Sequence, residues 1–264
     1  MPRSNLLPGV DSLIETDIAI AVTNLCFSYP DKPDILRDVT TQVKMGDRVG
    51  IIGHNGCGKT TFFLTICGVL APTAGAIQLF GKSVIPGQFY SEIGLLFQAP
   101  DDQLFSASVR DDIAFGPQNM GLSPEEVDRC VTEALMLTGM EAFADRPPHH
   151  LSGGEKQMVA IAGVLAMHPK IVLYDEPSAS LDLRARRRLI RFLQQSQETL
   201  LISSHDLELI LEVCDRVILM DSGHIVADGN PRQIMGDQAL MEAHGLEKPH
   251  SLMPHEERHH QGRL

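Results

Sequence analysis

The chain has 264 residues, of which 43% are hydrophobic and 21% charged, so it can form one large globular domain or two small ones and is not a disordered chain. Its 34 acidic and 22 basic residues give a net charge of −12, which argues against nucleic acid or an anionic membrane surface as the main partner. No apolar run approaches the roughly 18 residues of a membrane-spanning helix, and five cysteines without a CxxC pair argue against a zinc site or a disulfide framework and fit a reducing compartment.

Strand and helix patterns alternate along the chain after a leader at residues 1–17. We expect strands at 18–29, 49–52, 93–97, 171–174, 200–203, 217–220 and 224–227, the last two joined by a hairpin turn. We expect helices up to about Leu70, from Pro124, at 154–166, at 183–196 and after His205. The strand–helix alternation at both ends, with a helical insert at about 98–168, predicts an α/β core that carries a helical subdomain.

The C-terminal segment loses its strand signal from about Pro231. We expect residues 231–264 to form a flexible tail rich in histidine. Its five histidines are His244, His250, His255, His259 and His260. Histidine-rich tails can bind borderline metal ions, although this spacing defines no coordination geometry and a polar tail without metal is the simpler interpretation.

A glycine-rich segment follows the apolar run at 49–52. It reads Gly53-His54-Asn55-Gly56-Cys57-Gly58-Lys59-Thr60 and continues with Thr61. This pattern, GxxxxGK[ST], predicts a loop whose backbone N–H groups surround phosphate, with Lys59 on the β- and γ-phosphates and the Thr60 hydroxyl on Mg²⁺. Because Cys57 lies beside Lys59 at a helix N-terminus, we also expect the pKa of its thiol to be lowered.

Two carboxylates end the apolar strand at 171–174. Asp175 is suited to hold Mg²⁺ and Glu176 to activate the attacking water, as in phosphate-loop ATPases. A strand that ends in Asp-Glu is weak evidence alone, but the phosphate loop earlier in the chain favours catalysis over a solvated turn.

A further motif narrows the family. Leu151-Ser152-Gly153-Gly154-Glu155 resembles the signature of ABC-type ATPases, and the order of motifs from Tyr29 to His205 is also theirs. The resemblance covers about residues 18–230. It implies an ATPase with a P-loop (RecA-like) core, an antiparallel β part and a helical subdomain.

The resemblance also implies roles for single residues. Tyr29 would stack on adenine, Gln98 would reach Mg²⁺ and the attacking water, and His205 would contact the γ-phosphate. The signature would face ATP held by a second ATPase chain, with Asp182 bridging the interface. One chain has one phosphate loop and one signature, so we expect a dimer, either of identical chains or with a paralogue.

A narrower resemblance lies in the run from Phe97 to Pro117, which is similar to ATPases of energy-coupling-factor importers and most of all to those for cobalt and nickel. It implies a transmembrane coupling subunit, a membrane subunit that binds the solute, and a peripheral position on the cytoplasmic face of the inner membrane. Leu104, Phe105 and Phe115 would line the docking groove. Alternatives are an importer of vitamins such as biotin, a soluble ABC ATPase that does not transport, and a metal-storage module that acts through the tail.

Overall fold

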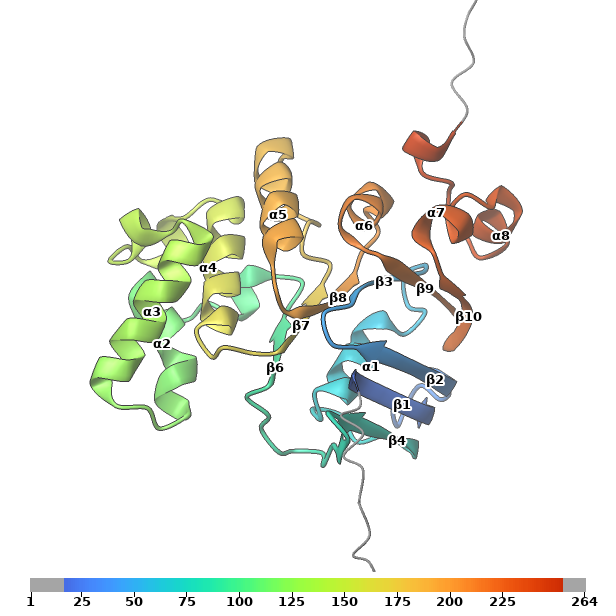
Figure 1. Cartoon of the computed structure of the whole chain (residues 1–264), viewed down its shortest axis with the longest axis horizontal. Helices are drawn as coiled ribbons and strands as arrows, with labels where there is room; N and C mark the ends of the chain where they lie inside the picture. The colour runs from blue at the N-terminus through green and yellow to red at the C-terminus, as the bar shows by residue number, and fades with distance from the viewer. Residues whose placement is uncertain (1–16, 254–264) are drawn as a thin grey trace, which may run out of the picture.

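The computed structural model describes residues 17–253, which form two β-sheets and several groups of helices (Figure 1). The smaller sheet is antiparallel, with the order β2-β1-β4-β5. Its strands are β1 (Ile18–Phe27), β2 (Leu36–Lys44), β4 (Ala74–Leu79) and β5 (Lys82–Ser83).

The larger sheet has the order β10-β9-β3-β8-β7-β6 and is parallel except for β10, which forms a hairpin with β9. Its strands are β3 (Arg48–Ile52), β6 (Ile93–Leu96), β7 (Ile171–Asp175), β8 (Thr199–Ser203), β9 (Arg216–Asp221) and β10 (His224–Gly229). This arrangement confirms the expected α/β class.

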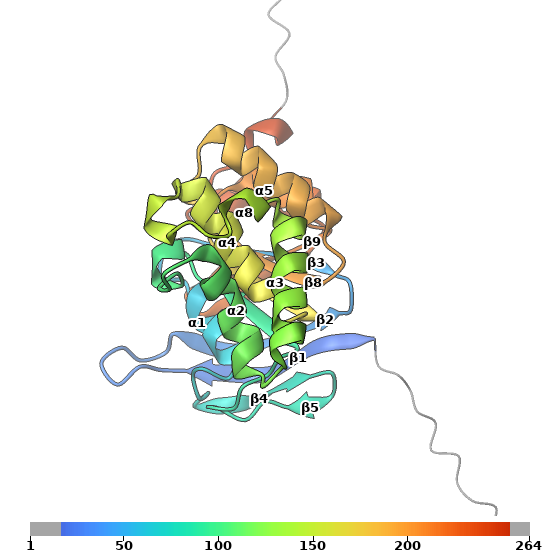
Figure 2. The same ribbon diagram turned by 90° about the vertical axis from the view of Figure 1, so that its left-hand side faces the viewer.

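Helices cover the larger sheet on both sides. Helix α1 (Lys59–Ile66) packs between the two sheets, whereas α5 (Leu183–Gln195) and α6 (Leu207–Val213) cover the opposite face (Figure 1). The helical subdomain stands to one side of the sheets in Figure 1 and faces the viewer in Figure 2. It consists of α2 (Val109–Asn119), α3 (Pro124–Thr138) and α4 (Gly153–Leu165). Short 3-10 helices lie at Pro100–Asp102, Glu141–Phe143, Pro148–His150 and His250–Leu252.

Strand β7 explains how one sheet serves two cores. All five of its residues are buried, and successive side chains point to opposite faces. Val172 and Tyr174 belong to the core beneath α5 and α6, whereas Leu173 belongs to the core around α1. Fully covered parallel strands therefore read as continuous apolar runs, and the sequence predicted this strand for that reason.

The capping signal at the start of α3 is confirmed. The Ser123 hydroxyl accepts the Glu126 N–H, and the Glu126 carboxylate accepts the Ser123 N–H at 2.8 Å. Helix α3 ends at Gly139, whose φ of 64° is left-handed. No helix in residues 17–253 is both long enough and apolar enough to cross a membrane.

The segment after Pro231 differs from the expected flexible tail as far as residue 253. It contains α7 (Pro231–Ile234) and α8 (Gln238–Ala243), which bury Met235 and Met241 completely. Both helices are short and have side-chain N-caps, Asn230 and Asp237. The loss of the strand pattern after Pro231 therefore marks a change to short helices and not to a flexible segment. Residues 1–16 of the expected leader at 1–17 and the histidines at 255, 259 and 260 lie outside the described residues.

Candidate functional site

The predicted site residues meet at one edge of the larger sheet. The phosphate loop follows β3, Asp175 and Glu176 end β7, His205 follows β8, and Gln98 follows β6. The carboxyl ends of parallel strands lie at the same edge, so segments that are more than 100 residues apart in sequence become neighbours.

Glycines shape the loop itself. Gly53 has φ 152°, and a Cβ there would stand 2.2 Å from the Met220 carbonyl oxygen. Gly58, the residue before α1, has φ 113°, a conformation that L side chains rarely adopt. The chain can therefore turn tightly from β3 into α1, with Lys59 as the first residue of the helix.

Lys59 is only 7% exposed, and its ammonium group has several close polar neighbours. Nζ donates to the Gly53 carbonyl oxygen at 2.8 Å and lies 3.3 Å from His205 Nε2 and 3.8 Å from Glu176 Oε1. These contacts hold the cation at the mouth of α1, where an anionic ligand is favoured by the helix dipole.

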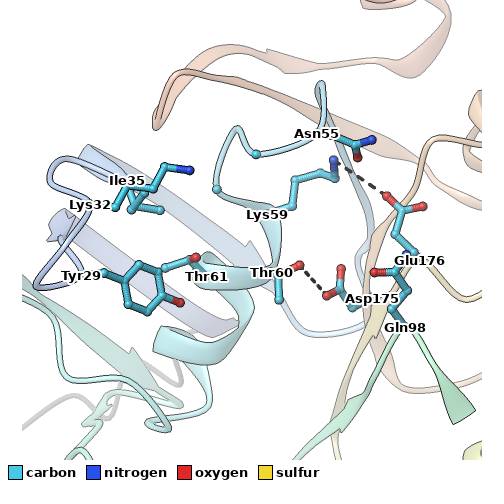
Figure 3. A pocket seen from close by; sticks show the side chains of 12 residues that line it. Tyr29, Lys32, Ile35, Asn55, Lys59, Thr60, Thr61, Gln98, Asp175 and Glu176 are labelled. Carbon is cyan, nitrogen blue, oxygen red and sulfur yellow. Dashed lines mark hydrogen bonds and ion pairs between the residues drawn. The ribbon is translucent and has the colours of Figure 1, made fainter. Parts of the chain in front are cut away.

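A cavity of about 190 Å³ opens beside the loop (Figure 3). It is lined by Tyr29, Lys32, Ile35, Asn55, Gly56, Gly58, Lys59, Thr60, Thr61, Gln98, Asp175 and Glu176. Sequence reasoning missed Lys32 and Ile35. The sequence signal that could have found them is their position just after Tyr29, the residue predicted to contact adenine. In the structure, the backbones of Tyr29 and Lys32 hydrogen-bond to each other in a tight turn.

Thr60 and Asp175 face each other across the cavity floor. The Thr60 hydroxyl donates to Asp175 Oδ2 at 2.7 Å, and the Ser203 hydroxyl donates to Asp175 Oδ1. The two oxygen groups that the sequence assigned to a hard cation thus lie together, 115 residues apart in the chain.

Glu176 is held in a fixed orientation. It is 8% exposed with φ 49°, and its Oε2 accepts the His205 N–H at 3.0 Å. Oε1 lies 3.3 Å from His205 Nε2 and has no hydrogen-bond donor within residues 17–253. A buried carboxylate oxygen without a donor is free to accept a proton from water.

Three loop residues lie apart from the cavity lining. Gly53 packs against β9, and the His54 ring turns to Asp221, with 2.9 Å between Nε2 and Oδ1. Cys57 is buried, and burial raises the pKa of its thiol more than nearby Lys59 lowers it. The expectation of a lowered pKa for Cys57 is therefore wrong, because desolvation outweighs the neighbouring charge.

The signature residues form the start of α4. Ser152 is the N-cap: its hydroxyl accepts the Glu155 N–H, and its own N–H donates to Glu155 Oε2 at 2.8 Å. Ser152 and Gly153 are exposed, whereas Leu151 is buried. A Cβ on Gly154 would approach Ala185 to 2.6 Å, so this glycine permits close contact with α5, whose N-cap is Asp182. The signature and Asp182 do not line the cavity of their own chain.

Comparison with known proteins identifies the family. A family model described as ABC transporter matches residues 36–179. This chain belongs to the ABC transporter ATPase family. An ABC transporter ATP-binding protein of Synechocystis is 63% identical over 252 residues, covering 96% of this chain and 88% of the relative. The energy-coupling factor transporter ATP-binding protein of Methanothermobacter thermautotrophicus is 44% identical over 238 residues, covering 87% and 76%.

A solved structure agrees with the fold of this ABC ATPase. CbiO1 of Clostridium perfringens, described as part of the ABC transporter complex CbiONQ, is 36% identical with a TM-score of 0.77. The match covers 86% of this chain and 94% of CbiO1. The P-loop ABC fold expected from the motifs is thus confirmed, and the chain is an ATP-hydrolysing subunit of the ABC transporter family.

Proposed function

We propose that the chain is the ATPase subunit of an energy-coupling-factor importer in which two ATPase chains close around two molecules of Mg·ATP. The observation that carries the proposal is the convergence of Lys59, Thr60, Asp175 and Glu176 on one cavity. The resemblance of residues 97–117 to energy-coupling-factor ATPases, and relatives that bear that name, support the choice of transporter class.

ATP would enter with its phosphates toward the loop. The Lys59 ammonium group and the loop N–H donors bind the β- and γ-phosphates, and Tyr29 contacts the adenine at the other end of the cavity. The Thr60 hydroxyl, the Asp175 carboxylate and the Gln98 amide are the oxygen ligands that suit Mg²⁺. When bound, Mg²⁺ supplies neutralisation of phosphate charge.

Glu176 would act as the base for the attacking water. Its Oε1 accepts the proton of the water, while the His205 N–H keeps the carboxylate oriented through Oε2. The His205 ring is 40% exposed and would donate to the γ-phosphate, as the resemblance to ABC-type ATPases implies. Lys59 and the loop amides stabilise the charge on the transferred phosphoryl group.

The second chain would complete each site. Ser152 and Gly153 expose the N-terminus of α4, and helix N-termini favour anions. The signature is absent from the cavity of its own chain, so a second copy or a paralogue would bring its α4 to the γ-phosphate, and Asp182 would lie at the contact.

An apolar groove of about 580 Å³ suits a transmembrane partner. Phe105, 66% exposed, and Phe115, 48% exposed, stack edge to face with ring centroids 4.9 Å apart, and Leu104 and Met167 line the same groove. Exposed apolar surface of this extent is typical of a contact with another protein. We propose that a coupling segment of the membrane subunit docks here, which would hold the ATPase at the cytoplasmic face of the inner membrane.

For the transported solute we propose Co²⁺, or Ni²⁺, which a separate membrane subunit would select. The support is the resemblance of residues 97–117 to cobalt and nickel ATPases. A role for the tail histidines receives less support, because His244 is held by Asp221 at 2.7 Å. A vitamin importer and a soluble ABC ATPase stay as the alternatives.

Copurification tests this function directly. The full chain, tagged and purified in mild detergent from membranes of its source cells, should retain a coupling subunit and a solute-binding subunit, with ATP-dependent uptake of radioactive Co²⁺ after reconstitution. Phe105→Asp should lose both membrane partners while ATP binding persists. Uptake of biotin in place of metal would favour the vitamin importer, and a chain with full activity but no membrane partner would favour the soluble ATPase.

A further inference from the structure

Asp221, the last residue of β9, lies between two histidines from distant parts of the chain. Its Oδ1 accepts His54 Nε2–H at 2.9 Å, and its Oδ2 accepts His244 Nδ1–H at 2.7 Å. His54 is the second residue of the phosphate loop, and His244 is the C-cap of α8. One carboxylate therefore joins the loop to the C-terminal helices.

The ring of His54 also contacts the loop backbone. Nδ1 lies 2.8 Å from the Asn55 carbonyl oxygen, so the ring lies between Asn55 and Asp221 and contacts both. Asn55 lines the nucleotide cavity, whereas His54 does not. The orientation of the ring is thus linked to a peptide group at the edge of the cavity.

Asp221 is a strong acceptor for both rings. Hydrogen bonds from His244, and to a smaller extent from His54 and Ser222, lower its pKa to about 2 despite some desolvation. It is consequently ionised near neutral pH, and hydrogen bonds to a charged group are stronger than those between neutral groups. The side chains facing it are those of His54, Ser222 and His244.

The C-terminal helices hold His244 in place. Met241 is fully buried, and its carbonyl oxygen accepts the His244 and Leu246 N–H groups. Gly245 follows with φ 69°, and a Cβ there would stand 4.0 Å from the Cβ of His54. The turn after α8 therefore lies directly against the phosphate loop.

We propose that His244, acting through Asp221, is a positioning residue for the phosphate loop and that the C-terminal helices thereby set the affinity for ATP. The inference rests on the proposed role of this loop in holding ATP. His54, Asp221 and His244 do not line the cavity, and Glu176 is not among their contacts. Their effect falls on nucleotide binding and leaves the hydrolytic step in place.

The test compares variants of the full chain. His244→Ala removes the donor to Asp221, whereas His244→Asn places an amide N–H near the position of Nδ1. We expect His244→Ala to raise the KM for ATP and the Kd of a fluorescent ATP analogue about tenfold, the effect of one hydrogen bond to a charged group, with kcat within about twofold of the parent. His244→Asn should recover most of the affinity. Gln238→Ala, which removes only a bond to Glu242 on the same helix, is the matched control and should change neither constant.

An unchanged KM for ATP in folded His244→Ala would overturn the proposal. An equal loss of ATP affinity in His244→Asn would also overturn it, because the effect would then come from packing of the side chain and not from its hydrogen bond. If His244→Ala does not fold, the test uses Asp221→Asn, which preserves the shape of the side chain. A raised KM for ATP in this variant supports the proposal, and a parental KM overturns it. Lys59→Ala tests separately whether the loop holds ATP at all. Undiminished binding of the fluorescent ATP analogue to that variant would refute the proposed role of the loop itself.

Discussion

Replacing Glu176 by Gln removes a charge while preserving shape. In the structure, Oε2 accepts the His205 N–H at 3.0 Å, and Oε1 is buried with no donor among the described residues. The carbonyl oxygen of Gln can keep the His205 contact. Its NH₂ group, however, would occupy the position that faces the attacking water, and an amide cannot take up a proton. The substitution therefore separates orientation of the site from proton transfer.

The size of the effect follows from the role assigned to Oε1. Proton transfer to a positioned base typically contributes about 10²- to 10⁴-fold in rate. At about 1.4 kcal/mol per factor of ten, this corresponds to roughly 3 to 5 kcal/mol in the barrier. Binding should change little, because the proposed phosphate contacts come from Lys59 and the loop amides. Loss of repulsion between Glu176 and the γ-phosphate should favour binding slightly.

The assay is steady-state phosphate release at saturating Mg·ATP, with the Kd of an ATP analogue measured in parallel. We expect kcat to fall at least about 100-fold while the analogue still binds, and an ATP-bound dimer to accumulate in size-exclusion chromatography. Gln238→Ala, which lies outside the cavity, serves as the control. Hydrolysis at the parental rate in Glu176→Gln would refute the reasoning and assign the base to another group.

Two further predictions concern stability. Met241→Ala should lower the free energy of unfolding by about 3 kcal/mol, and Tm by roughly 6–12 °C, because it empties a fully buried site, whereas Met45→Ala, at an exposed position, should change Tm little in the same calorimetric scan. Folding lowers the pKa of Asp221 from 3.8 to about 2, so its ionised carboxylate stabilises the folded state fully above pH 3.8, and this stabilisation is lost as the pH falls toward 2. Urea unfolding measured at a series of pH values should show this loss of stability in the parent and a smaller loss in Asp221→Asn.

Some elements could be predicted from the sequence because their signals are local. Strand β7 is a continuous apolar run, and the capping box at Ser123 is complete within four residues. Strand β2 was missed because the left-handed Asp38 (φ 52°) and a shift of register interrupt its alternation. Helix α2 contains Gly116 and Pro117, two residues that normally end a helix, and it is kept by packing within the subdomain.

The candidate site shows the same division. Residues in contiguous motifs, such as Lys59 and Thr60, could be predicted to lie in one site because the proposed chemistry needs them at fixed spacing, and both line the cavity. The partners of His54 could not, because Asp221 lies 167 residues away and only the pairing of β3 with β9 brings it close. For Cys57 the charged neighbour is visible in the sequence, but its burial depends on tertiary packing, and burial is the larger influence on the pKa.

The two perturbations of the phosphate site act on different steps for a structural reason. Glu176 and His205 follow the ends of β7 and β8 and lie close to Lys59, and Glu176 lines the cavity with it, which is where the proposed hydrolysis takes place. Asp221 belongs to β9, on the other side of β3, and contacts the loop through His54, outside the cavity. A change at Glu176 therefore appears in kcat, and a change at His244 appears in KM. If Glu176→Gln instead changed KM and His244→Ala instead changed kcat, the phosphate loop and the base would not act independently.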